Sequence, residues 1–324
     1  MTSAFDVLGI GNAIVDVIAR ADDAFLGKHT LTKGSMMLID EARAETLYGA
    51  MGPGIEVSGG SCGNTMAGVA SFGGKGAYIG KVRNDQLGGV FGHDLRSIGV
   101  SFDTTAATSG PATARCLILV TPDAQRTMNT YLGACTGLGP NDIDTKVVAA
   151  AQVTYVEGYL WDEPEAKKAV LKAFDTAHAA GKLVSITLSD SFCVDRYRDE
   201  FRALVRDKID ILFGNESEIK SLYQVDLFEK ALEATRKEAK IAALTRSEKG
   251  SVVIKGSETY EVPAAPVAKV VDTTGAGDLY ASGFLYGFTR NKPLAECARL
   301  GGIAAAEIIS HVGARPETPL KDLI

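Results

Sequence analysis

The fold is decided by a stretch of seven residues, Asp272-Thr273-Thr274-Gly275-Ala276-Gly277-Asp278. It follows a run at 268–271 that we predict to be a strand, and it opens a glycine-rich apolar helix predicted at 279–288. Two glycines around a small residue at a helix start let backbone N–H groups converge on an anion, and the helix dipole adds partial positive charge. We therefore predict a phosphate-binding turn that uses the amides of Gly275, Ala276 and Gly277.

Asp278 ends this stretch and is a poor ground-state ligand for phosphate, because a carboxylate repels it. Its position instead fits a base that takes a proton from an attacking hydroxyl while the amides hold the phosphoryl group. The alternative is an ordinary glycine-rich turn with an acidic residue in the first turn of a helix. The four residues G-A-G-D alone would leave that alternative open.

The second half of the chain alternates short β-branched runs with amphipathic segments. This alternation predicts βαβ units and a mainly parallel sheet covered by helices, with ligand-binding loops along one edge. The predicted strands are 152–156, 183–187, 209–213, 241–245 and 252–255. The predicted helices are 163–180, 216–223 and 227–240.

Two stretches depart from that rhythm and predict a small additional β-sheet. They are residues 31–39 and residues 113–132, the latter with two β-rich runs joined by a turn at Pro122 and Asp123. We expect one domain over residues 1–324, with lid segments at about 12–58 and 108–135. A lid over the substrate, an edge extension and a dimer contact all remain possible for this sheet.

The composition of the 324 residues excludes several classes of protein. A net charge of −6 without a basic cluster disfavours a nucleic-acid or membrane surface as the main partner. Five scattered cysteines without a C-x-x-C pair predict neither a disulfide framework nor a zinc site. The first apolar run contains Asn12 and Asp16, which disfavours a signal peptide, and the P-loop motif is absent. We expect a cytoplasmic protein.

Three further motifs precede the first in the chain. The segment 59–64, G-G-S-C-G-N, comes before a predicted helix at 65–72, and the segment 215–218, N-E-S-E, directly follows a predicted strand. The second pattern is also a common helix-capping arrangement, so a metal role and a cap both remain open. Gly9-Ile10-Gly11-Asn12-Ala13-Ile14 fails the dinucleotide fingerprint because Ile14 takes the place of the third glycine.

Together these motifs resemble the ribokinase-like, or phosphofructokinase B-type, family of sugar and nucleoside kinases. The resemblance extends from the segment at 9–16 to Gly313, which is nearly the whole chain. It implies a three-layer α/β ribokinase-like fold with a mainly parallel central sheet and a small β-sheet lid. It also implies an ATP-dependent kinase that phosphorylates an alcohol, with Asp278 as the catalytic base.

The resemblance assigns the sugar site to Asp16, Gly59, Gly60 and Asn64. One carboxylate can accept hydrogen bonds from two vicinal hydroxyls, which suits Asp16 and a ribose. Gly60 would allow a close approach, and Asn64 can both donate and accept.

The resemblance assigns the ATP site to the other motifs. Asn215 and Glu218 would organise Mg²⁺ through water, and Thr245, with Arg246, would contact the phosphates together with Thr274, Gly275 and Gly277. The family often has glycine where this chain has Ser247. Residues 304–313 resemble the segment that forms the adenine slot, and Asp272, Thr274 and Gly313 match positions that bind K⁺ in some members.

Arg126 resembles a lid arginine that some nucleoside kinases bring to the phosphates, where it would neutralise charge. An arginine at the rim without a role is the alternative.

The acceptor is the remaining question. The G-G-S-x-x-N form, the stretch at 213–218 and R-T-M-N at 126–129 look more like adenosine kinases than ribokinases or fructokinases. Met128, Tyr131, Tyr159 and Trp161 could line a slot for a flat base, although core packing is the alternative for the last two. We expect transfer to the 5′-hydroxyl of a ribonucleoside, most simply adenosine. A sugar or sugar-acid kinase, and a non-catalytic nucleotide or sugar sensor, are the alternatives. A homodimer through the lid is also possible.

Overall fold

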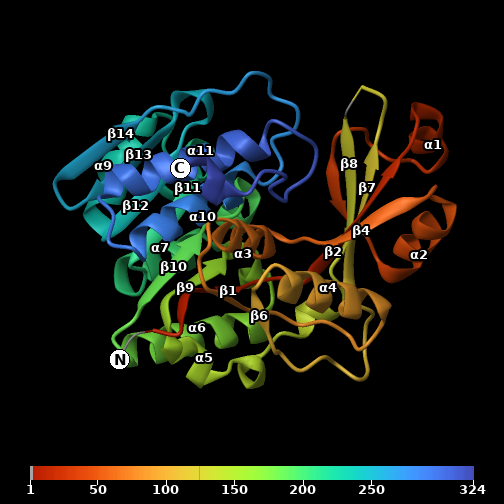
Figure 1. Cartoon of the computed structure of the whole chain (residues 1–324), viewed down its shortest axis with the longest axis horizontal. Coiled ribbons are helices and arrows are strands. Elements are labelled where there is room, and N and C mark those ends of the chain that lie inside the picture. Colours follow the sequence, from red (N-terminus) through yellow and green to blue (C-terminus); the bar gives the residue numbers. More distant parts are fainter. Residues whose placement is uncertain (1–2, 124) are drawn as a thin grey trace.

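The protein is described here by a computed structural model of residues 3–123 and 125–324. These residues form a large sheet covered by helices and a smaller sheet that stands to one side of it (Figure 1).

Nine strands make the large sheet, and seven of them are parallel. Neighbouring strands are parallel from β6 to β12, while β12, β13 and β14 are joined in antiparallel pairs. The parallel strands are mostly apolar and buried, because helices cover both of their faces. In order across the sheet the strands are β14 (Glu258–Val262), β13 (Ser251–Lys255), β12 (Ile241–Thr245), β11 (Ile211–Asn215), β10 (Leu183–Thr187), β9 (Ala151–Glu157), β1 (Phe5–Ile10), β5 (Gly76–Ile79) and β6 (Ser101–Phe102).

Helices form a layer on each face of this sheet, and each layer contributes a hydrophobic core cluster. This arrangement confirms the predicted three-layer α/β fold, and it places the loops after β1, β9, β11 and β12 along one edge. One layer holds α3 (Ser61–Ser71), α4 (Gln86–Ser97), α10 (Ala276–Phe288) and α11 (Leu294–Ile308). The other holds α5 (Thr145–Ala150), α6 (Pro164–Ala179), α7 (Ser191–Asp207), α8 (Glu216–Tyr223) and α9 (Phe228–Glu238).

The smaller sheet has five strands, and α1 (Asp23–Lys28) and α2 (Glu41–Ala50) pack on one of its faces. Leu26 of α1 and Leu47 of α2 share a core cluster with Val17 and Leu117 of the sheet. The opposite face carries Asp16 and is described with the site below. In order the strands are β3 (Met36–Leu38), β8 (Arg126–Tyr131), β7 (Ala114–Val120), β2 (Ile14–Arg20) and β4 (Gly54–Ser58).

Several local predictions were wrong. Residues 268–271 form no strand; the Val271 N–H instead donates to the Ile309 carbonyl at 2.8 Å, in a loop rather than beside a strand. Only Met36–Leu38 of the stretch 31–39 is a strand. Helix α7 and edge strand β14 were not predicted, because α7 is highly polar and β14 is largely exposed.

None of the helices formed by the described residues combines the length and apolarity needed to cross a membrane.

Candidate active site

The turn at 272–278 starts α10 in the conformation that the sequence predicts for an anion site. Gly275 is the N-cap with φ of +79°, which glycine adopts without strain, and no side chain caps the helix. Asp272 shapes the turn, because its Oδ1 accepts from the N–H and the hydroxyl of Thr274 at 3.0 and 2.7 Å. The Ala276 N–H already donates to the Thr273 carbonyl at 3.2 Å. An uncapped helix start therefore faces the site.

Asp278 is held by two residues of helix α3. Its Oδ1 accepts a hydrogen bond from the Ser61 hydroxyl at 2.6 Å, and its Oδ2 accepts one from Asn64 Nδ2 at 3.0 Å. Burial raises the pKa of Asp278, while the two hydrogen bonds and the charge of Arg315 lower it. A desolvated carboxylate with fixed orientation and spare lone pairs can accept a proton from a third hydroxyl group.

The glycines at 59 and 60 let the chain pass close to its neighbours. Gly60 has φ of +80°, and a Cβ there would lie 2.5 Å from the Asn12 carbonyl oxygen. A Cβ on Gly59 would lie 2.4 Å from Asp16 Oδ2. Asn64 is 6% exposed, and its buried Oδ1 has no hydrogen-bond partner among the described residues. An acceptor left free in this way fits a donor on a bound ligand.

Asp16 lies within β2 of the small sheet. It pairs with Val57 of β4 and Cys116 of β7. Burial raises its pKa to about 6, against the nearby charges of Arg315 and Arg126, and Asp278 raises it further. The small sheet therefore presents one carboxylate toward the site.

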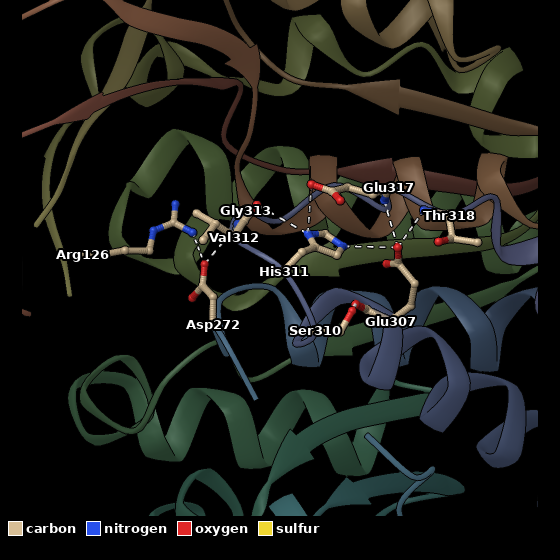
Figure 2. Close-up of polar contacts among 9 residues, drawn as sticks. All are labelled: Arg126, Asp272, Glu307, Ser310, His311, Val312, Gly313, Glu317 and Thr318. Carbon is tan, nitrogen blue, oxygen red and sulfur yellow. Dashed lines mark hydrogen bonds and ion pairs between the residues drawn. The ribbon is translucent and has the colours of Figure 1, made fainter. Parts of the chain in front are cut away.

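Arg126 reaches from β8 of the small sheet to the turn before α10. One guanidinium nitrogen donates to Asp272 Oδ2, which also accepts from the Gly313 N–H at 3.1 Å (Figure 2). The side chains of both partners are less than one-tenth exposed. Nε and Nη2 of Arg126 are buried without a partner among the described residues. These two donors fit an anionic ligand beside the turn.

Asn215 and Glu218 form a capping box at the start of α8. The Asn215 side chain accepts from the Glu218 N–H at 2.9 Å, and Glu218 Oε2 accepts from the Asn215 N–H at 3.0 Å. Burial raises the pKa of Glu218 to about 7, and the charges of Asp190 and Asp278 add to this effect. The described residues contain no cluster of three or more side chains able to hold a metal ion directly. A cation held mainly through water would still relieve the repulsion between these carboxylates.

Thr245 ends β12 beside Asn215 of β11. Arg246, the next residue, donates from Nε to Glu216 Oε2 at 2.9 Å and lies 3.8 Å from the centre of the Phe228 ring. Ser247 has φ of +53°. Glycine would adopt this left-handed conformation with less strain than serine.

Trp161 does not line the site. It is 3% exposed in the core cluster beneath α6, its ring centroid is 5.8 Å from that of Phe201, and its Nε1 donates to Glu200 at 2.8 Å. The proposed slot for a flat base therefore loses this residue. Tyr159 is only partly buried, with its hydroxyl 3.5 Å from the Ser189 carbonyl.

Sequence reasoning missed Glu157 and Arg315. Glu157 ends β9 and accepts from the N–H groups of Asn12 and Cys62, both at 2.9 Å. Burial raises its pKa to about 7, against these two hydrogen bonds. Arg315 lies after α11 and donates to the Ser58 carbonyl at 2.8 Å. Glu157 could have been found from the sequence, because it is a charged residue at the end of an apolar strand and such residues fall at the ligand-binding edge of the sheet. Arg315 has no comparable pattern around it.

Comparisons with known proteins agree with this geometry. Residues 53–321 match the family model described as pfkB family carbohydrate kinase. A probable sugar kinase from Rhizobium etli is 55% identical, with a TM-score of 0.92 over 99% of this chain and 98% of that chain. The adenosine kinase from Sinorhizobium meliloti is 54% identical, with a TM-score of 0.91 over 98% of both chains. The adenosine kinase of Saccharomyces cerevisiae is 28% identical, covering 97% of this chain and 96% of its own.

Proposed function

The chain belongs to the pfkB family of carbohydrate kinases, and from this premise we propose that its acceptor is the 5′-hydroxyl of adenosine. The family and its relatives make the chain an ATP-dependent kinase that acts on an alcohol, within the group of nucleoside and sugar kinases. The nucleoside is the proposal.

The observation that carries the proposal is an apolar row on the small sheet, between Asp16 and Arg126. Residues directly opposite one another in neighbouring strands share a face, so the registers define three successive rows. Asp16 belongs to the first row and Arg126 to the third. The second row consists of Ile55, Ile18, Ile118, Met128 and Met36.

This apolar row is a suitable surface for a purine. Ile55 and Met36 are 70% and 50% exposed, and Leu38 on the same face is 61% exposed. Apolar side chains left open beside a polar site bind the flat face of a base, whereas a free sugar has no apolar face of that size to cover them. The small sheet would then act as a lid, with Asp16 on the ribose hydroxyls and the row against the base.

The relatives support the same assignment. The proteins from Sinorhizobium meliloti and Saccharomyces cerevisiae are both adenosine kinases. The relative from Rhizobium etli is described as a probable sugar kinase, and its sequence identity to this chain, 55%, is close to the 54% of the adenosine kinase from Sinorhizobium meliloti. A sugar acceptor is therefore the second candidate.

In the proposed mechanism, Asp16, Gly60 and Asn64 hold the sugar, and Asp278 removes the proton of its primary hydroxyl group. Backbone N–H groups of Gly275 and Gly277 stabilise the transferring phosphoryl group, and the free donors of Arg126 neutralise its charge. Mg²⁺, held through water near Asn215 and Glu218, would shield the phosphates of ATP.

The test is an ADP-release assay over a panel of nucleosides, free sugars and sugar acids, with ³¹P NMR to locate the new phosphate ester. We expect adenosine to give a 5′-phosphate. A free sugar as the best acceptor would refute the nucleoside but leave the kinase intact. A panel without ADP release above background would refute the kinase.

A further inference from the structure

The segment after α11, residues 309–318, is fixed at its middle and at its C-terminal end; we call it the C-terminal strap. At its middle, the Gly313 N–H donates to Asp272 at 3.1 Å. At its C-terminal end, the N–H groups of Glu317 and Thr318 donate to Glu307 Oε1 at 2.9 and 2.8 Å, and this oxygen also lies 3.2 Å from His311 Nε2 (Figure 2). The strap therefore holds a defined position relative to the turn that precedes α10.

Arg315 lies between these two anchors and extends to the junction of β4 and α3. Its Nε and Nη2 donate to the carbonyl of Ser58, and Nη2 also contacts the Ser58 hydroxyl at 3.1 Å. Its Nη1 donates to the carbonyl of Gly63. The rigid fork of a guanidinium group suits two carbonyls on either side of this junction.

The residues next to these two carbonyls include the partners of the proposed base. Ser61 and Asn64 lie at the start of α3, and both donate to the carboxylate of Asp278. Ser58 is 2% exposed, so its carbonyl depends on this arginine and has little access to water. A shift of the start of α3 would move both hydrogen bonds to the base at once.

We propose that Arg315 is a positioning residue for phosphoryl transfer, which sets the junction of β4 and α3 at 58–64, and through Ser61 and Asn64 the carboxylate of Asp278. The proposal rests on the role of Asp278 in the proposed function. The hydrogen bonds of Arg315 go to Ser58 and Gly63 and not to Asp278 itself.

The same guanidinium group also brings positive charge to a group of buried acids. Its charge lowers the pKa of Asp278 and of Asp16, so it favours the ionised form that accepts a proton. Within the described chain, the titratable groups that face Asp278 are Asp16, Cys62, Tyr155, Glu157, Tyr159, Glu218 and Arg315. Arg315 is the one cation in that set, so its loss should be visible in the titration of the base.

The test measures kcat against pH at saturating ATP and adenosine, which reports groups in the enzyme–substrate complex. Arg315→Gln should lower the maximal kcat of the pH profile roughly tenfold to a hundredfold. It should also move the acidic limb of the profile to higher pH, by on the order of one pH unit. Arg315→Lys keeps the charge but loses the planar guanidinium group. The acidic limb of its kcat–pH profile should therefore stay at the same pH, while its maximal kcat falls by at least about fivefold. Arg299→Gln is the matched control, because Arg299 of α11 only pairs with Glu296 on the surface at 2.8 Å.

Two results would overturn the proposal. One is a folded Arg315→Gln protein whose acidic limb coincides with that of the Arg299→Gln protein. The other is an Arg315→Lys protein with the wild-type maximal kcat, which decides the matter even if the Gln variant does not fold. Asp278→Asn in the same assay separates the proposed function from the positioning role. If this variant keeps nearly wild-type turnover, Asp278 is not the base. If it loses turnover while the Arg315 variants behave like the wild type, only the positioning role is refuted.

Discussion

Replacing Asp278 by Asn should remove turnover without removing the fold. The new amide keeps the shape of the carboxylate and can still accept one hydrogen bond from Ser61 or Asn64. Asn64 can adapt to the other contact, because its Oδ1 is buried without a partner among the described residues. The neutral amide cannot take a proton from a hydroxyl, so kcat should fall by roughly two to four orders of magnitude.

Asp→Asn usually lowers the stability of the folded protein where the carboxylate is held by hydrogen bonds and cations. At Asp278 the same change should not lower it. Burial raises the pKa of Asp278, so its ionised form destabilises the folded protein at neutral pH. A neutral substitute should leave the melting temperature unchanged or raise it. Asp210 is the matched control, because its carboxylate accepts from the Val184 N–H and from Lys240, both at 2.8 Å, far from the site.

Asp210→Asn should therefore lower the free energy of unfolding by about 1–3 kcal/mol, and with it the melting temperature. Its kcat should equal that of the wild type. Steady-state kinetics and thermal melts on both variants give the comparison. Turnover of Asp278→Asn within about threefold of wild type would refute the reasoning. So would a loss of folding in Asp278→Asn that equals the loss in the control.

The remaining predictions concern the metal, the sugar carboxylate and the lid arginine. Glu218→Gln should raise the Mg²⁺ concentration for half-maximal rate and leave the KM for adenosine unchanged; an unaltered Mg²⁺ titration in a less stable variant would mean that Glu218 is only a helix cap. Burial raises the pKa of Asp16 in the folded protein to about 6, above its value of about 3.9 in the unfolded chain. As pH rises from the lower to the higher of these values, ionisation of Asp16 makes the folded protein less stable. Without substrate, Asp16→Asn should thus melt level with wild type at pH 4 and higher at pH 7.5; a gap that does not change with pH would contradict this. Arg126→Lys loses the planar fork and should lower kcat by roughly tenfold or more, with folding intact by circular dichroism; unchanged kcat would leave Arg126 a rim residue.

The parts of the fold that were predicted correctly have strong local patterns. Strands 183–187 and 241–245 and helix 216–223 have the predicted bounds, because apolar β-branched runs and a capping pattern mark them. Residues 268–271 look equally apolar but form a loop. Whether such a run joins a sheet depends on whether a neighbouring strand is free to pair with it, which local sequence does not reveal.

The site shows the same division. The left-handed Gly275 that starts α10 and the close approach at glycines 59 and 60 are local features that residue type makes predictable, whereas anion binding at the turn stays a prediction. Arg315 could not, because one arginine in a polar segment has no distinctive neighbours and gains its partners only in the folded chain. The pairing of Arg126 with Asp272 likewise joins a strand of the small sheet to the turn before α10, residues far apart in the sequence.

The measurement that tests the central claim most directly is kcat/KM for adenosine, 2′-deoxyadenosine, ribose and fructose at saturating ATP. Adenosine should have the highest value, because its base covers the apolar row beside Asp16. Loss of the 2′-hydroxyl should cost at least about tenfold, since a buried carboxylate loses one of two hydrogen-bonded partners. A higher kcat/KM for ribose or fructose than for adenosine would contradict the nucleoside assignment.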